Sequence, residues 1–131
     1  MKRERKRRRG VATVELALVA LLLFAMLFGI IEFGSIFYVR HNMVQAARET
    51  ARRLAVQDGV ATPMAAMDNL ESRFPSVNFS IDVQQPASPA AADQDVTVTI
   101  TAPLAEAAIV DPLGILSAQT LRAEVTMRKE G

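Results

Sequence analysis

Two residues near the N-terminus have the types and the spacing most suggestive of chemistry. Gly10 follows a block of basic residues, and Glu15 lies inside the apolar run that begins at Val11. A carboxylate near the middle of a bilayer costs about 3 kcal/mol, and less towards the edge, so Glu15 should have a partner. Cleavage of the peptide bond after Gly10 would give Val11 a free α-amino group near the depth of Glu15. In a staggered bundle of such helices, a neighbour's amine can pair with this carboxylate and offset its desolvation.

A second interpretation of Glu15 needs no cleavage. A glutamate in the first turn of an anchor helix is favoured by the positive end of the helix dipole. The combination of a basic leader, a glycine, this spacing and an apolar run is more specific than any of its parts. It resembles the arrangement of type IV prepilins, which implies that Gly10 and Val11 form a cleavage site and that Glu15 acts between subunits.

Charge is distributed very unevenly along the 131 residues. Residues 1–9 carry a net charge of +6 and residues 10–131 a net charge of −5, which together give +1. Nucleic-acid-binding proteins spread positive charge over a folded face, so this distribution argues against that class. Next to a membrane-length apolar run, the basic block instead predicts that the N-terminus stays in the cytoplasm.

The apolar run predicts one transmembrane helix over residues 11–39. Its only charges are Glu15 and Glu32, and about 20 apolar residues are enough to span a bilayer core. A cleaved secretory signal peptide fits poorly, because the apolar core is too long and no small-x-small site follows it. An uncleaved signal anchor explains the run but not the glycine and the glutamate. Residues 1–10 are therefore expected to be a removable leader, and residues 40–131 an exported domain.

The leader, the glycine and the glutamate at the fifth position after it resemble the arrangement of type IV prepilins. More specifically, "RRGVATVELALV" and "GIIEFGSIFYVRHNMVQAARETARRLAV" resemble the TadE-like pseudopilins of the tight-adherence pilus system. That family has a second acidic residue near the end of the apolar run, where the helix leaves the membrane. An alanine- and arginine-rich helix follows it. The positions that match are Gly10, Glu15, Glu32, Gly34, Ala46, Ala47 and Arg52.

The resemblance implies a function, a location and partners. It implies processing by a prepilin peptidase and action with other pilins, pseudopilins and the pilus assembly machinery in the bacterial inner membrane. The chain departs from the pattern at Leu16 and Ala20, where the family often has phenylalanine and proline. It also lacks the glutamate–tyrosine pair and the early end of short Flp major pilins, which favours an accessory subunit. The alternative is an unprocessed, signal-anchored envelope adaptor with a small exported domain.

Behind the membrane segment, "RHNMVQAARETARRLAVQDG" predicts an amphipathic helix. Glu49 and Arg53 are spaced as a favourable i,i+4 pair on its polar side. If this helix continues the membrane helix, residues 11–57 form one helix about 70 Å long. The alternative is a separate surface helix, with a bend at Gly29 or Gly34. Its apolar stripe consists of Met43, Val44, Ala47, Ala51, Leu54 and Ala55.

The remainder predicts a small α+β domain. A short helix is expected over 63–73, with Thr62 as N-cap and Pro63 as its first residue. Alternation predicts strands at 77–84, 96–101 and 120–127, and the connection between the last two should hold a helical turn or two. The amphipathic helix is the nearest cover for such a sheet. The predicted fold is therefore pilin-like: a long N-terminal helix packed on an antiparallel sheet of about three strands. The apolar side of the short helix should contain Met64, Met67, Leu70 and Phe74.

Residue types that catalysis or metal binding requires are scarce. The chain has one histidine, His41, and no cysteine, so no His/Cys zinc site can form. Asp93 and Asp95 make a weak D-x-D pattern that a solvated loop explains better than a calcium site. No glycine-rich phosphate loop or nucleophile elbow is present. The sequence therefore predicts no enzyme, no cofactor and no metal, and an exported enzyme is the weaker hypothesis.

Overall fold

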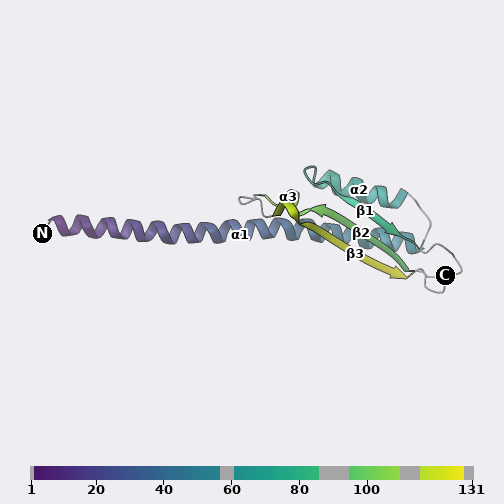
Figure 1. Cartoon of the computed structure of the whole chain (residues 1–131), viewed down its shortest axis with the longest axis horizontal. Coiled ribbons are helices and arrows are strands. Elements are labelled where there is room, and N and C mark those ends of the chain that lie inside the picture. Colours follow the sequence, from purple (N-terminus) through teal and green to yellow (C-terminus); the bar gives the residue numbers. More distant parts are fainter. Residues whose placement is uncertain (1, 57–60, 86–94, 110–115, 129–131) are drawn as a thin grey trace.

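A computed structural model describes residues 2–56, 61–85, 95–109 and 116–128, with the backbone alone at 2–9, 61, 62 and 117. Its longest element is α1 (Lys2–Val56), a single helix of 55 residues that extends far beyond the rest of the fold (Figure 1). The other elements gather around the C-terminal part of α1 and form a head. They are α2 (Ala61–Arg73), β1 (Ser80–Gln84), β2 (Asp95–Pro103), α3 (Leu104–Ala107), the 3-10 helix η1 (Leu116–Ala118) and β3 (Thr120–Arg128).

Helix α1 runs without interruption from the apolar segment into the head. This confirms the continuous helix, up to Val56, and shows that the bend considered at Gly29 or Gly34 is wrong. A β-carbon added at either glycine would meet no atom within 4 Å, so neither marks a close contact. A helical glycine costs only about 1 kcal/mol relative to alanine, which the surrounding leucines and alanines can offset.

The three strands form one antiparallel sheet with β2 in the centre. Val98 of β2 pairs with Val83 of β1 and with Val125 of β3, and this register puts the apolar side chains of all three strands on one face. The predicted antiparallel sheet is therefore confirmed, and so is the face of each strand. Two short helices, α3 and η1, lie in the connection between β2 and β3, where helical turns were expected.

The first strand begins at Ser80, three residues later than predicted. Val77 and Phe79 are buried as the alternation requires, at 5% and 7% exposure. Continued pairing would place Asn78 opposite Pro103, which has no N–H to donate. The N–H of Asn78 instead donates to Oε2 of Glu106, at 2.6 Å. The ladder therefore ends where its partner strand reaches a proline.

The second helix begins at Ala61, two residues earlier than predicted. Pro63 lies in its first turn, where a missing N–H costs nothing. The inclusion of Met64 in the apolar side was wrong, because this side chain is 70% exposed, whereas Leu70 is 3% exposed. Three residues of an α-helix turn through about 300°, which is about 60° less than a full turn. Met64 and Leu70 are six residues apart, so their side chains lie about 120° apart around the helix axis.

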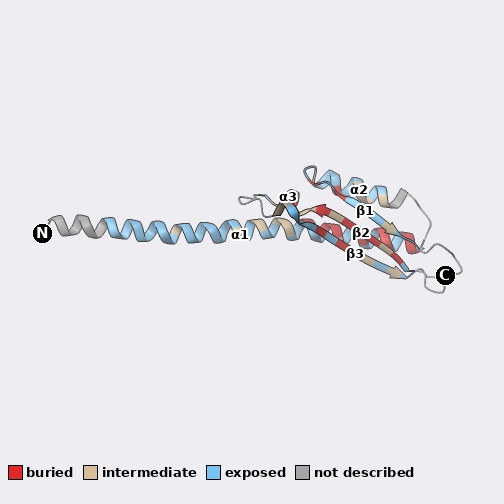
Figure 2. Cartoon of the chain, viewed as in Figure 1, coloured by how far each residue is buried: buried red, intermediate tan, exposed pale blue. Residues whose placement is uncertain are grey.

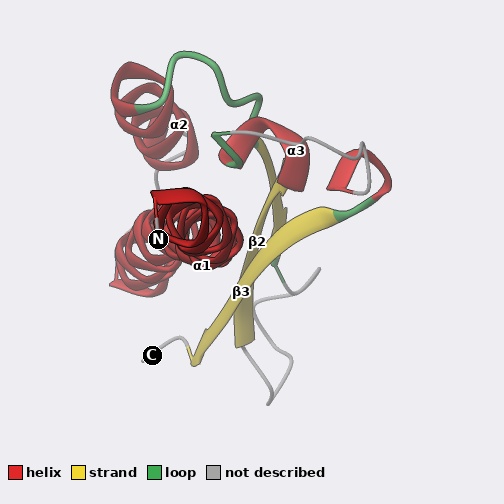
Figure 3. Ribbon diagram, turned by 90° about the vertical axis from the view of Figure 1, so that its left-hand side faces the viewer, coloured by secondary structure: helices red, strands yellow, loops and turns green. Residues whose placement is uncertain are grey.

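The core lies between α1 and the inner face of the sheet, with α2 against another side of α1 (Figure 3). Met43, Ala47 and Ala51 of α1 are completely buried, as are Val98 and Ile100 of β2. The small alanines let the helix axis approach the sheet closely. The predicted apolar stripe is confirmed, with Val44 only half-buried at its margin. On the polar side, Glu49 Oε1 and Arg53 Nε form the predicted pair at 2.7 Å.

Polar and aromatic contacts fix the C-terminal end of α2 to α1. Arg73 Nη1 donates to Oδ1 of Asn42 at 2.8 Å, and Nδ2 of Asn42 donates to the carbonyl of Tyr38 at 2.8 Å. The ring of Phe74 meets Tyr38 edge-on, at 5.5 Å between centroids, and Phe79 at 6.2 Å. The start of β1 is thereby tied to the same point on α1.

We expect Phe79→Ala to lower the free energy of unfolding of the head by about 3 kcal/mol, because it leaves a cavity beside Phe74. The matched change Ser80→Ala, on the exposed face, should stay within about 0.5 kcal/mol. Hydrogen exchange of the β2 amides in the detergent-solubilised full chain measures both. Equal effects of the two substitutions would show that the faces of β1 are assigned wrongly.

Candidate functional site: the exposed half of helix α1

The N-terminal half of α1 exposes large apolar side chains on all sides. Within Gly10–Val56, the most apolar window has a mean hydropathy of 2.7, and none of it is buried in the molecule (Figure 2). Leu16, Leu21 and Ile30, for example, are 68%, 68% and 69% exposed. Soluble monomers rarely expose continuous apolar surface on this scale. By its length and composition, this half of the helix is suited to membrane anchoring.

Gly10, Val11 and Glu15 lie close together at the start of this exposed half. All three are exposed, and a β-carbon at Gly10 would meet no atom within 4 Å. Val11 and Glu15 are four residues apart and therefore share a side of the helix, about 6 Å apart along its axis. None of the hydrogen bonds or ion pairs found among the described residues involves Glu15. Its carboxylate has no counter-charge in the described part of the chain.

Glu32 lies at the opposite end of the exposed half, where the head begins. Ser35 Oγ is 2.8 Å from the carbonyl of Glu32 and 3.2 Å from the carbonyl of Ala107, and it shares its proton between them. Glu32 is half-buried one turn before Ser35, which contacts α3. Glu15 and Glu32 are separated by about 26 Å along the helix, so the structure does not bring them together.

Contacts between α1 and the head begin earlier than residue 40. Val39 is 4% exposed in the core, and Ile36 packs against it. A signal for this was present in the sequence, because the stripe of Met43 and Ala47 continues backwards to Val39 and Ile36 at helical spacing. Sequence reasoning stopped at the end of the uncharged run and therefore missed it.

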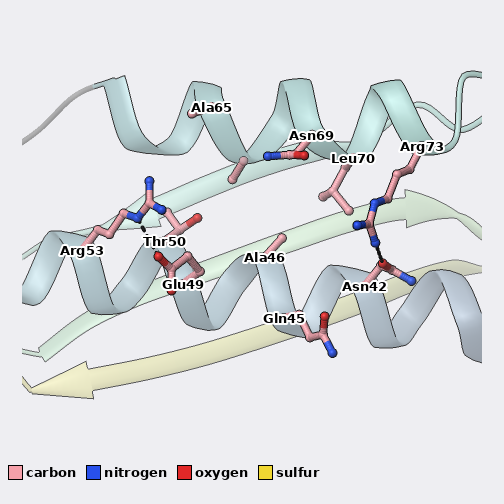
Figure 4. Close-up of a pocket in the computed structure, with 11 residues that line it drawn as sticks. Asn42, Gln45, Ala46, Glu49, Thr50, Arg53, Ala65, Asn69, Leu70 and Arg73 are labelled. Atoms are coloured by element: carbon pink, nitrogen blue, oxygen red, sulfur yellow. Dashed lines mark hydrogen bonds and ion pairs between the residues drawn. The ribbon is translucent and has the colours of Figure 1, made fainter.

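A groove of about 270 Å³ with both polar and apolar lining lies between α1 and α2 (Figure 4). Its charged side chains already have partners: Glu49 pairs with Arg53, and Arg73 donates to Asn42. His41 is exposed on α1, with Nε2 2.7 Å from Nε2 of Gln45. Among the described residues, no three His, Cys, Asp or Glu side chains are placed to hold a metal ion. Asp95 is exposed at the start of β2, and Asp93 lies outside the described residues.

Residues 10–52 match the model of a family described as TadE-like protein. The matched segment contains Gly10, Glu15 and Glu32 and ends before α2, so the sheet lies outside it. Comparisons with curated proteins and with solved structures gave no match. The family match confirms the resemblance to TadE-like proteins over residues 10–52, the part of α1 that carries all the residues of the candidate site.

Proposed function

We propose that the protein is a membrane-inserted pseudopilin or minor pilin, processed by a prepilin peptidase after Gly10, that acts in the assembly of a tight-adherence type IV pilus. The observation that carries this proposal is Gly10, which differs from the equally open Gly29 and Gly34 in its position between the basic block and Glu15. It sits inside a helix, where glycine costs about 1 kcal/mol, although a β-carbon there would meet nothing. Neither packing nor an unusual backbone conformation requires a glycine at this position. Recognition of Gly10 by a peptidase that cleaves the chain before assembly would explain why glycine is present at this position.

Glu15 supports the second half of the proposal. It is an exposed carboxylate on a helix surface suited to lipid, with no counter-charge among the described residues. A charge in this environment is unfavourable unless another charge accompanies it. After cleavage, the α-amino group of Val11 in a neighbouring subunit is a positive charge at a similar depth. Their pairing would favour assembled helices over isolated ones.

The dimensions of α1 suit the proposed placement in the bacterial inner membrane. Gly10–Ile31 precedes the head contacts and comprises 22 residues, or about 33 Å of helix, close to the thickness of a bilayer core of about 30 Å. The basic leader then stays in the cytoplasm and the head is exported. Its partners there are the prepilin peptidase, other pilins and pseudopilins, the assembly machinery and lipid.

The orientation is tested with reporters at the two ends of the chain. A phosphatase that is active only outside the cytoplasm should be active when fused after Gly131. The same enzyme fused before Met1 should be inactive, because seven basic residues oppose translocation of the N-terminus. Activity in the N-terminal fusion and none in the C-terminal fusion would contradict the proposal.

Gly10→Leu should leave the full-length precursor in the membrane, because a bulky side chain then occupies the position that the peptidase reads. Gly29→Leu is the matched control: it adds the same side chain to an open position of the same helix and should leave processing unchanged. Immunoblots of membrane fractions, with N-terminal sequencing of the mature form, measure the outcome. A Gly10→Leu protein cut normally, or a wild-type protein that keeps Met1, would favour the signal-anchored adaptor.

Glu15→Leu should be inserted and cleaved as the wild type, but its incorporation into assemblies should fall at least tenfold, because the neighbour's amine loses its counter-charge. Glu15→Asp should keep part of the function, since the charge remains although its reach is shorter. Ala17→Leu, also exposed on α1, controls for added apolar volume. Pilus counts and co-purification with other pilins measure assembly. Normal assembly of Glu15→Leu would contradict the role of this glutamate between subunits; a helix-dipole role is not the alternative, because α1 begins at Lys2 and Glu15 lies beyond its first turn.

A further inference from the structure

The head carries two exposed helix faces of opposite charge. The first, which we term the α1 outer face, consists of Arg48, Arg52 and Val56. The second, the α2 outer face, consists of Met64, Asp68 and Glu71. All six side chains are exposed, and none of the four charged ones has an ion-pair partner among the described residues.

The α1 outer face forms a single column, because its members are four residues apart. It points away from the sheet, since Ala47 and Ala51 are the side chains of this part of α1 that are completely buried against it. A membrane surface does not fit this face. Arg48 lies 17 residues beyond Ile31, or about 25 Å along a straight helix, and would therefore lie well outside a bilayer that α1 leaves near Ile31.

The α2 outer face is a similar column, on the side of α2 opposite to Leu70. It places Met64 one turn before Asp68 and two turns before Glu71. Val56 and Met64, one from each face, are 74% and 70% exposed, more than any other large apolar side chain in the described part of the chain. Nothing in the described part of the chain, which excludes residues 57–60, explains why its two most exposed large apolar side chains lie beside charges without an ion-pair partner there.

We propose that the α1 outer face of one copy binds the α2 outer face of a second copy. Within one copy, α2 follows α1 after a short connection and returns along it, so the two helices are antiparallel (Figure 1). Copies that stand in one membrane point the same way, which makes the α1 of one copy antiparallel to the α2 of the next. The contact is therefore compatible with membrane-anchored subunits.

One register satisfies all three pairs of residues. When Arg52 faces Asp68, an antiparallel alignment puts Val56 opposite Met64, four residues further along one helix and four residues back along the other. The same alignment brings Arg48 within one residue of facing Glu71. Two ion pairs and one apolar contact then form together, although the two faces were defined by exposure and charge alone.

The register also requires an offset between the copies. Within one copy Arg73 contacts Asn42, so residue 73 of α2 lies level with residue 42 of α1. In the proposed intermolecular register, residue 73 lies level with residue 47 of the neighbouring α1, which is five residues further along the helix. The second copy is therefore shifted by roughly 7.5 Å along α1. Because the two faces are different, the contact is head-to-tail and leaves a free face at each end, so it can repeat. A staircase of copies, rather than a closed dimer, is the expected product.

Disulfide cross-linking tests this contact directly, because the chain has no native cysteine. Full-length Val56→Cys and Met64→Cys proteins with different tags are co-expressed and oxidised in native membranes. The mixed dimer should exceed each homodimer at least tenfold, and Val56→Cys with Ser80→Cys, on the exposed face of β1, should give none. A chain that carries both cysteines should give a ladder of oligomers. Predominant homodimers, equal yield with Ser80→Cys, or no cross-link would overturn the proposal.

Charge exchange shows whether the pairs matter. On the Val56→Cys chain, Arg52→Glu should lower the mixed-dimer yield at least fivefold, and Asp68→Arg on the Met64→Cys chain should restore it. Arg122→Glu, on the exposed face of β3, is the control for the same charge change elsewhere on the head; it breaks only the exposed pair with Glu124 and should leave the mixed-dimer yield unchanged. Persistence of the cross-link in Arg52→Glu, or failure of Asp68→Arg to restore it, would overturn the charge pairing. The proposed contact does not depend on processing. The cross-link should therefore also form in chains that carry Gly10→Leu.

Discussion

The packing of α1 against the inner face of the sheet is the contact on which the rest of the structure depends. The inner face of the three-stranded sheet is apolar and has to be covered by another element. Met43, Ala47 and Ala51 cover Val98 and Ile100, and all five are completely buried. The core of the head is therefore completed by the same helix that forms the exposed apolar segment. Because that helix is continuous, a displacement of the anchor is transmitted directly to the head.

The sequence of α1 changes its pattern where its surroundings change. From Val11 to Ile31 the helix is apolar on every side except at Glu15, as a lipid environment requires, whereas from Val39 only one stripe is apolar. Glu32 and Ser35 lie between the two regions, and Ser35 links the backbone of α1 to Ala107 of α3. This contact holds α3 against α1 at the boundary. The head is thereby positioned at a fixed distance from the apolar segment.

Much of this arrangement could be predicted because it depends on local periodicity. Alternation assigned Val77 and Phe79 to the buried side, and helical spacing assigned Met43 and Ala47 to the core. Periodicity says which side of an element is buried but not which element buries it, so the contacts of Asn42 with Arg73 and of Asn78 with Glu106 could not be foreseen.

The candidate site was more accessible to sequence reasoning than the fold. Gly10, Val11 and Glu15 lie within six consecutive residues, so their relationship needs only the geometry of one helix. What the sequence could not provide was the evidence that Gly10 has free space around it and that Glu15 has no counter-charge within the described chain. Both observations require a structure that shows which described atoms lie near Gly10 and Glu15.

The two proposed intermolecular contacts lie at opposite ends of one rigid element and would restrict each other. Arg48 is 33 residues beyond Glu15, or about 50 Å along α1. A pair between Glu15 and a neighbour's amine is strong in lipid but positions only one end of the helix, while exposed ion pairs in the head are individually weak. If the two contacts were joined by a flexible chain, forming one would strengthen the other only a little. On a straight helix, each contact instead raises the effective concentration of the other.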